Sequence, residues 1–353
     1  MNRKIPFSEE ELRVVEVRPG FMGRPGNPII NTPVTPKENI TALFWDKESY
    51  WYPLPGEMGY WAAPFYNDML GRGGPAGTTD AFGIVWEWVE SARGSIVHPG
   101  DPFLSNANEW PDKIHFPNLD EIDWKADVEK SQMPDLRFSP QMSLINGFWF
   151  ERLISFMDFA PAATALVDED QQDAVKSLFR ATTDFACDLV DHIVHYYPFL
   201  DGFNIHDDWG AQKNPFFSMD IAYEFFVPYM RDLTDHMHSY GKYVTLHSCG
   251  NNEKRVQAFI DGGFDQWDPQ PMNDTHALYE EFGDKMIFGI IPDQFDPEKT
   301  SVDEQRAAAR AYVDKFYKPG KVSMFNLYAG PVMTDAFKEE VYVYSRKKYG
   351  GTV

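Results

Sequence analysis

The chain has 353 residues, of which 43% are hydrophobic and 16% aromatic. This length is enough for one large domain, and the hydrophobic content excludes a disordered protein. The formal charge of −22, from 32 basic and 54 acidic residues, argues against a nucleic-acid partner, because binding to phosphates needs clustered Lys and Arg.

The beginning of the chain and its cysteines bear on its location. The first residues, MNRKIPFSEEEL, lack the apolar run of a signal peptide, and no later segment has the ~18 uncharged apolar residues of a membrane span. The two cysteines, Cys187 and Cys249, do not make the disulfide framework of a secreted protein. We therefore expect a cytoplasmic protein with no membrane association.

The first part of the chain is dense in aromatic residues and prolines, notably at 44–66. Residues 71–80 are rich in glycine, but no predicted strand precedes them and no helix follows, so they are interpreted as a loop and not as a phosphate cradle. Residues 80–100 are interpreted as a small β element, and residues 142–150 as a strand. The tryptophans Trp86 and Trp88 in this region either pack in the core or line a pocket for a flat ligand.

Strands and helices alternate in the rest of the chain. Strands are predicted where apolar segments become abruptly polar, at 202–209, 242–249, 263–270, 285–294 and 321–328. One helix is predicted over 218–240. A second is predicted to begin at a capping box formed by Ser301 and Glu304, and a last one to begin at Thr334. This alternation predicts βαβ units and a parallel sheet.

Five consecutive units of this kind, without a GxGxxG turn, favour a (β/α)8 TIM barrel over a doubly wound sheet. We therefore predict an α/β fold with one barrel domain over residues 1–353. Residues 1–140 would form the early strands and an aromatic-rich N-terminal elaboration, and residues 141–353 the regular βα units.

Polar side chains follow each of these five strands, at the end where barrels carry their reactive groups. They are Asp207 and Asp208, His247 and Cys249, Asp268 and Gln270, Asp293 and Gln294, and Asn326 and Tyr328. One polar ending is ordinary for a strand that enters a loop, whereas five in succession predict a functional cluster. We expect the strand ends at Asp208, His247, Gln270, Asp293 and Tyr328 to converge in one pocket.

His247 and Cys249 are two residues apart, so their side chains point to the same side of an extended strand. An imidazole nitrogen and a thiolate sulfur together suit Zn²⁺, which tolerates an open fourth position in catalytic sites. The alternative is a turn that holds an ordinary histidine and cysteine. His192, His195, His236 and His238 lie on predicted helices and are interpreted as solvated or helix-end side chains, and Cys187 as core.

Four segments together resemble a known family: DDWG (207–210), HSCGN (247–251), PQPMND (269–274) and a strand that ends in PDQ (292–294). They resemble the uroporphyrinogen decarboxylase-like superfamily, and most of all its corrinoid-dependent methyltransferase branch. Residues 35–53 and 80–88 resemble the methyltransferase I component of aryl methyl ether O-demethylases. The resemblance implies a TIM barrel that moves a methyl group from a methoxylated aromatic compound to the Co(I) of a separate corrinoid protein.

The resemblance also implies roles for individual residues. In thiol-activating relatives an HxC pair and a later cysteine hold zinc, and the pair falls here on His247 and Cys249. The stretch that matches the later cysteine, FNLYAGP (325–331), has none, so the third ligand is open between Asp208, Asp293 and Gln270. Trp86, Trp88, Gln270 and Asn326 are the residues expected to bind the substrate.

Departure of a phenolate requires neutralisation of the charge that develops on the ether oxygen. Zinc can supply this as a Lewis acid. Alternatively, a buried acid with a raised pKa donates a proton, and the candidates are Asp207, Asp208, Asp293 and Tyr328. Other functions left open are methyl transfer from a methylcorrinoid to a thiol, a uroporphyrinogen decarboxylase-like decarboxylation, for which the arginine-rich N-terminal motif is missing, and a non-catalytic barrel that binds corrinoid or a small aromatic.

Overall fold

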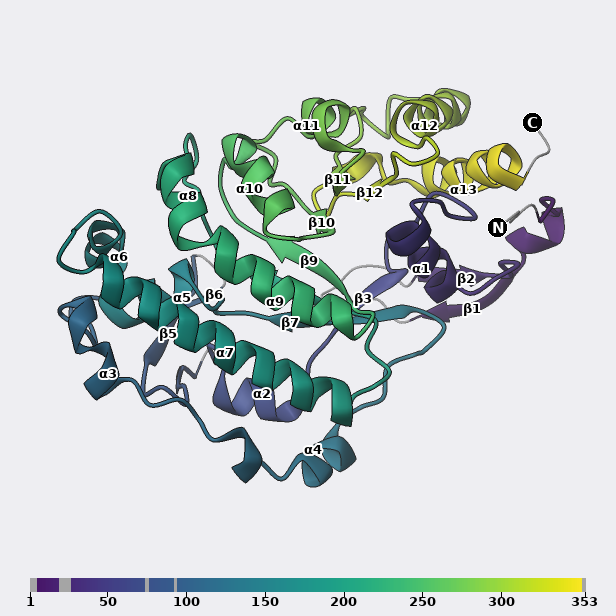
Figure 1. The fold of residues 1–353 in the computed structure, drawn as a ribbon. Helices are drawn as coiled ribbons and strands as arrows, with labels where there is room; N and C mark the ends of the chain where they lie inside the picture. Colours follow the sequence, from purple (N-terminus) through teal and green to yellow (C-terminus); the bar gives the residue numbers. More distant parts are fainter. Residues whose placement is uncertain (1–4, 19–26, 74–75, 92–93, 351–353) are drawn as a thin grey trace. The chain divides into compact units, whose positions relative to one another are not determined.

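The computed structural model describes residues 5–18, 27–73, 76–91 and 94–350 (Figure 1). Residues 74–75 of the glycine-rich segment and residues 92–93 of the predicted β element lie outside the described residues. Two compact units emerge, one of Met1–Gly59, Asp135–Ser139 and Asp274–Val353, the other of Tyr60–Pro134 and Pro140–Asn273. Each is described by itself, and a single domain over the whole chain stays a prediction.

The second unit contains parallel βα units. Its helices are α2 (Pro64–Met69), α3 (Trp110–Lys113), α4 (Trp124–Lys130), α5 (Phe150–Met157), α6 (Phe159–Ala165), α7 (Gln172–Tyr196), α8 (Met219–Phe225), α9 (Val227–Ser239) and α10 (Val256–Asp261), with short 3₁₀ turns at Ala107–Glu109, Leu119–Glu121 and Glu253–Arg255. Its parallel strands are β7 (Ser139–Leu144), β8 (Gly202–His206), β9 (Tyr243–His247) and β10 (Gln266–Trp267).

The register of these strands explains how they position side chains. β7 pairs with β8, β8 with β9, and β9 with β10, all in parallel. Phe203, Ile205, Val244 and Leu246 are all buried, and they alternate along β8 and β9 with a second set of side chains on the opposite face. That opposite face ends in His206 and His247, which are direct neighbours in the register.

The strand predicted over 142–150 is wrong at its C-terminal end, because β7 stops at Leu144 and α5 begins at Phe150. The reason lies in the turn, where Asn146 and Gly147 have φ angles of 79° and 50°, which no strand residue adopts. A Cβ on Gly147 would also lie 2.5 Å from the carbonyl oxygen of His206. The chain therefore leaves the sheet earlier than its apolar sequence suggests.

The single helix predicted over 218–240 is two helices, α8 and α9, which break at Phe226. Pro228 has no N–H to donate to the preceding turn, and its ring clashes with that turn, so α9 has to begin anew. The predicted helical location of His192, His195, His236 and His238 is confirmed, on α7 and α9, which lie against each other (Figure 1).

The small β element predicted within 80–100 is confirmed as an antiparallel sheet of β4 (Thr78–Thr79), β5 (Val85–Val89) and β6 (Gly94–Val97). Asp80 organises one end of it, since its buried carboxylate accepts from the backbone N–H of Phe82 and Ile84, from the Trp86 indole and from the Arg152 guanidinium. The sheet is therefore anchored to α5 through a buried ion pair.

The first unit contains a second set of βα elements. They are η1 (Glu9–Leu12), β1 (Val14–Arg18), β2 (Asn27–Ile30), α1 (Pro36–Asp46), α11 (Thr275–Phe282), β11 (Ile287–Ile290), α12 (Val302–Phe316), β12 (Ser323–Phe325), η5 (Gly330–Val332) and α13 (Asp335–Gly350), while β3 (Met58–Trp61) crosses the boundary between the units. β11 and β12 are parallel. The capping box of Ser301 and Glu304 at the start of α12 is confirmed, as is the last helix.

The architecture is thus mixed α/β with parallel βα units, as predicted. A complete (β/α)8 barrel is not seen in the part of the chain that the structure describes, so closure stays a prediction. Among the described helices, none combines the length and apolar content that crossing a membrane requires.

Candidate metal centre

Two neighbouring strands of the second unit each end in a histidine. His206 is the last residue of β8 and His247 the last of β9, and the two are paired in the register. Their rings are stacked, with centroids 4.1 Å apart and planes inclined by 13°. The hydrogen bonds of the sheet therefore bring two imidazoles together at the C-terminal edge of the strands.

A ladder of buried polar side chains lies beneath these rings on the same face. Thr245 donates to the amide oxygen of Gln141, Asn204 donates to Thr245, and Ser143 donates to Asn204, at 2.8–3.2 Å. Asn204 and Thr245 precede the two histidines by two residues, so side-chain alternation places them on the same face. Because the ladder satisfies its own polar groups, it forms a rigid floor for the site.

The loops that follow the two strands are tied together. The backbone N–H of Cys249 donates to Asp208 Oδ1 at 2.7 Å, and Gly210 N–H donates to the Cys249 carbonyl at 3.1 Å. Gly250 has a φ of 88°, and a Cβ there would lie 2.1 Å from the backbone of Gly210, so a larger residue would separate the loops. This contact holds Asp208 and Cys249 near the histidines.

Four potential ligands meet at this point. One ligand atom each from His206, Asp208 and His247 lies within 4.8 Å of the others, and His247 Nε2 is 3.1 Å from Cys249 Sγ. Ligand atoms around one tetrahedral zinc lie roughly 3–4 Å apart, given Zn–N and Zn–S bonds of about 2.0–2.3 Å. Two imidazoles, a carboxylate and a thiol are donors that suit zinc, and the distances of His247 Nε2 from Asp208 Oδ1 and from Cys249 Sγ, 3.9 and 3.1 Å, fall in that range.

Burial shifts the pKa values of the side chains in this cluster, and of these shifts only that of His247 favours metal binding by itself. Burial, together with the neighbouring His206, lowers the pKa of His247 to about 3, so its ring is neutral and keeps a free lone pair. Burial and the nearby Asp208 raise the pKa of the Cys249 thiol, and burial and Glu151 raise the pKa of Asp208. A divalent cation would reverse both of the latter shifts, because it stabilises thiolate and carboxylate.

Glu151, in the first turn of α5, contacts His206 from behind the site. Its Oε2 lies 2.7 Å from His206 Nδ1, and its Oε1 accepts from Arg72 Nη2 at 2.9 Å. Burial opposes ionisation of Glu151, but His206 and Arg72 outweigh it and lower the pKa to about 2. Burial by itself lowers the pKa of His206, but the Glu151 carboxylate outweighs this effect and raises the pKa above its ordinary value.

The structure brings Asp208, His247, Cys249 and Gln270 together. Gln270 Nε2 donates to Cys249 Sγ at 3.3 Å, and its Oε1 accepts from Gly250 N–H at 2.8 Å. Asp207 is fully buried beside them but has a separate set of partners. It accepts from the N–H groups of Phe150 and Glu151 and from the Trp209 indole, so it fixes the start of α5.

Burial, together with the Glu151 charge, raises the pKa of Asp207 to about 7. Its carboxylate nevertheless faces the N-terminus of a helix, where backbone N–H groups already occupy both oxygens. Asp208 is thus the better placed of the two acids to act on a ligand at the histidines.

Asp293, Asn326 and Tyr328 belong to the first unit, and their convergence with His247 stays a prediction. The Asp293 carboxylate is 90% exposed and lies 3.9 Å from His276 Nδ1, so it is not the buried acid that the sequence suggested. Asn326 is buried and bound at the end of the two parallel strands, donating to the Gly289 carbonyl and accepting from the N–H of Tyr328. The Tyr328 side chain is 41% exposed.

Trp86 and Trp88 lie on the same face of β5 but differ in burial. Trp86 is buried and donates to Asp80, whereas Trp88 is half-buried and donates to the exposed Glu90. Replacement of Trp86 by alanine is expected to destabilise the fold by about 3–5 kcal/mol. Trp88 is therefore the better test of an aromatic-binding role.

If Trp88 contacts a methoxyarene, Trp88→Ala raises the KM for a dimethoxybenzene about 10–100-fold, as loss of one apolar contact of 1–3 kcal/mol predicts. Ile96→Ala, on the opposite face of the same sheet, is the matched control. Steady-state kinetics and thermal melting of both variants check this. If the KM of the Trp88 variant equals that of the wild type, Trp88 contributes to packing and does not contact the substrate.

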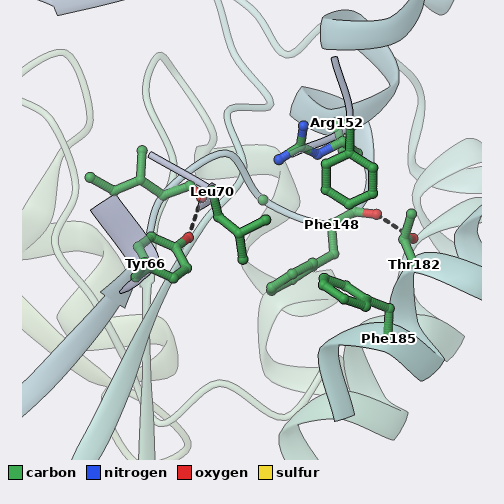
Figure 2. Close-up of a pocket in the computed structure, with 9 residues that line it drawn as sticks. Tyr66, Leu70, Phe148, Arg152, Thr182 and Phe185 are labelled. Carbon is green, nitrogen blue, oxygen red and sulfur yellow. Dashed lines mark hydrogen bonds between the residues drawn. The ribbon is translucent and has the colours of Figure 1, made fainter. Parts of the chain in front are cut away.

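A small cavity lies beneath the start of α5 (Figure 2), with Tyr66, Leu70, Phe148, Arg152, Thr182 and Phe185 among its lining residues. Its volume of about 10 Å³ is close to the minimum for one water molecule and cannot admit an aromatic ring. Tyr66 donates to the Ile145 carbonyl and Thr182 to the Phe148 carbonyl at its edge. This cavity is part of the packing and not a substrate site.

Sequence reasoning missed His206 and Glu151. A signal for His206 was present, because GFNIH and YVTLH are five-residue strands that both end in histidine. No comparable signal marked Glu151, which directly follows the segment 142–150 that was interpreted as a strand.

No family model and no curated protein matches the chain. Among solved structures, a methyltransferase from Methanosarcina mazei is similar over 76% of this chain and 76% of its own, with a TM-score of 0.48 and 15% sequence identity. A likeness at this level leaves the function to be argued from the residues themselves.

Proposed function

We propose that the chain is a corrinoid-dependent methyltransferase that removes the methyl group of an aryl methyl ether and passes it to the Co(I) of a separate corrinoid protein. The proposal includes a zinc ion held by His247, Cys249, Asp208 and His206. The observation that carries it is the meeting of these four side chains at the ends of two adjacent parallel strands, within motifs that resemble the corrinoid-dependent branch.

The location of the cluster supports catalysis over a structural role. The ligands are half-buried, with His247 23% and Asp208 28% exposed, so a small molecule can reach them. With four protein ligands, the zinc would take the ether oxygen as a fifth ligand, an expansion that catalytic zinc sites undergo. The third ligand left open by the sequence is proposed here as Asp208, with His206 as an additional donor.

Zinc at this place would act as a Lewis acid toward the ether oxygen. The protein ligands would determine the net charge of the zinc site. Cys249 and Asp208 would each supply one negative charge, and the two imidazoles would be neutral. Asp208 also carries the alternative chemistry. Its pKa is raised by burial and by Glu151, which is the direction required of an acid that would donate a proton to a departing phenolate in the absence of a metal.

The test is a mixture of the protein, a methoxyarene and a corrinoid protein reduced to Co(I). We expect the absorption spectrum of the corrinoid to convert to that of methyl-Co(III), with one phenol released for each methyl group. A parallel reaction starts from the methylcorrinoid protein and a thiol. Methylation of the thiol without demethylation of the ether would make the chain a thiol methyltransferase, and no conversion in either reaction would make it a binding protein.

A further inference from the structure

The geometry points to Glu151 as a positioning residue that fixes the tautomer and orientation of His206, leaving Nε2 as the nitrogen that faces the candidate metal centre. This inference rests on the proposed function for the identity of the ligand, but its structural part concerns His206 alone. It assigns a role to a residue outside the motifs that suggested the site.

Glu151 is held on both its side chain and its backbone. Its carboxylate is 10% exposed and contacts His206 Nδ1 at 2.7 Å, and its backbone N–H donates to Asp207 Oδ1 at 2.8 Å. Asp207 directly follows His206 in the chain. The start of α5 is thus bound to the end of β8 by two independent contacts, and Glu151 has little freedom to turn away.

Arg72 determines how Glu151 presents its two oxygens. Its guanidinium donates to Glu151 Oε1 and to Asn146 Oδ1, and lies over the Trp86 ring, 5.2 Å from the centroid. With Oε1 bound to Arg72, Oε2 is directed to His206. Both oxygens of the carboxylate are therefore occupied by Arg72 and His206, and the carboxylate does not act as a ligand itself.

A carboxylate on one imidazole nitrogen selects which nitrogen carries the proton. When the ring is neutral and its Nδ1–H donates to Glu151, the lone pair is on Nε2. Stacking against His247 at 4.1 Å fixes the plane of the ring. Carboxylate–histidine pairs of this kind orient metal ligands in proteins, and their loss costs about 10–100-fold in metal affinity.

The competing explanation is that Arg72, Glu151 and His206 form an ion-pair network that only stabilises the fold. The two explanations differ in what Glu151→Ala does to the folded protein. A positioning role predicts altered zinc affinity and an altered tautomer of His206, whereas a structural role predicts a lower melting temperature alone.

Zinc affinity is measured by competition with a chelator, on Glu151→Ala and on Glu87→Ala as the matched control. Glu87 contacts His98 Nδ1 at 2.6 Å in an exposed pair. We expect the Glu151 variant to bind zinc about 10–100-fold more weakly and the Glu87 variant to be unchanged. Equal zinc affinity of wild type and the Glu151 variant would overturn the inference.

A second measurement does not depend on metal or on the stability of a variant. ¹⁵N NMR of the metal-free wild type, with the imidazole nitrogens of His206 assigned, reports which one is protonated. We expect Nδ1 to carry a proton bonded to Glu151, and Glu151→Gln, which keeps an acceptor oxygen, to retain it. A neutral ring protonated only on Nε2 would refute the inference. A wild type that binds no zinc would instead remove the metal from the proposed function, while the orientation of His206 would stand on this spectrum.

Discussion

Replacing His247 by alanine, or Cys249 by serine, is expected to abolish stoichiometric zinc and methyl transfer together. Each side chain supplies one donor to the cluster, and the loss of Lewis-acid assistance is expected to lower kcat/KM about 10²–10⁴-fold. The fold should survive, because both residues lie where a strand enters a loop and His247 is 23% exposed. This contrasts with a small zinc finger, in which metal binding of roughly 10–16 kcal/mol is the folding energy itself.

Metal analysis, methyl-transfer kinetics and denaturation on the same preparations check this expectation. His236→Ala is the control, because His236 lies on α9, where its ring contacts Asp191 and Tyr240. Variants that melt early while their folded fraction stays active would show that the pair is structural. If the wild type is fully active without zinc, the Lewis-acid mechanism is wrong, and proton donation by Asp208 becomes the proposed mechanism.

Asp80→Ala is expected to lower the free energy of unfolding by about 3–5 kcal/mol. The Asp80 side chain is 0% exposed and the Arg152 side chain 5%. Its carboxylate accepts from two backbone N–H groups, from the Trp86 indole and from Arg152, at 3.0–3.1 Å. The substitution leaves a buried guanidinium without its counter-charge and the indole without its acceptor.

Chemical denaturation followed by tryptophan fluorescence measures this loss. Glu87→Ala, on the exposed face of the same small sheet, removes only an exposed pair and should change the free energy of unfolding by less than about 1 kcal/mol. Equal stability of the two variants would mean that the buried pair contributes little. Near-wild-type zinc affinity in folded Asp80→Ala would show that this anchor and the metal centre are separable.

The strands at the site were predictable because their apolar segments end abruptly in polar residues. β8 and β9 lie where the sequence predicts them, and the capping box predicted α12 because Ser301 and Glu304 have the spacing that satisfies free N–H groups. Local chemistry determines such features. His247 and Cys249 were singled out in the same way, from their spacing, but β9 ends at His247 and Cys249 lies in the loop that follows.

The parts that were not predicted depend on contacts distant in sequence. His206 becomes a candidate ligand only through its register with His247, 41 positions later, as hydrogen bonding of the sheet defines it. Glu151 approaches His206 only because β7 ends early and α5 starts at the turn. The end of β7 depends on two residues with positive φ, whose effect on an apolar segment is not visible in its hydrophobic pattern.

The side chains of the candidate metal centre come from two kinds of backbone, strands and loops, which differ in how freely they can vary. His206 and His247 are carried by strands in register, so their separation is a property of the backbone and follows the roughly 4.8 Å spacing of the sheet. Asp208 and Cys249 are carried by loops, which are held together by the contact between Gly210 and Gly250. In the proposed zinc site, exchange of the loop-borne Asp208 or Cys249 would change the charge and softness of the donor set, while the strand-borne imidazoles would keep its position. The choice of metal and the choice of reaction would then evolve in the loops, on a pair of nitrogens that the sheet holds constant.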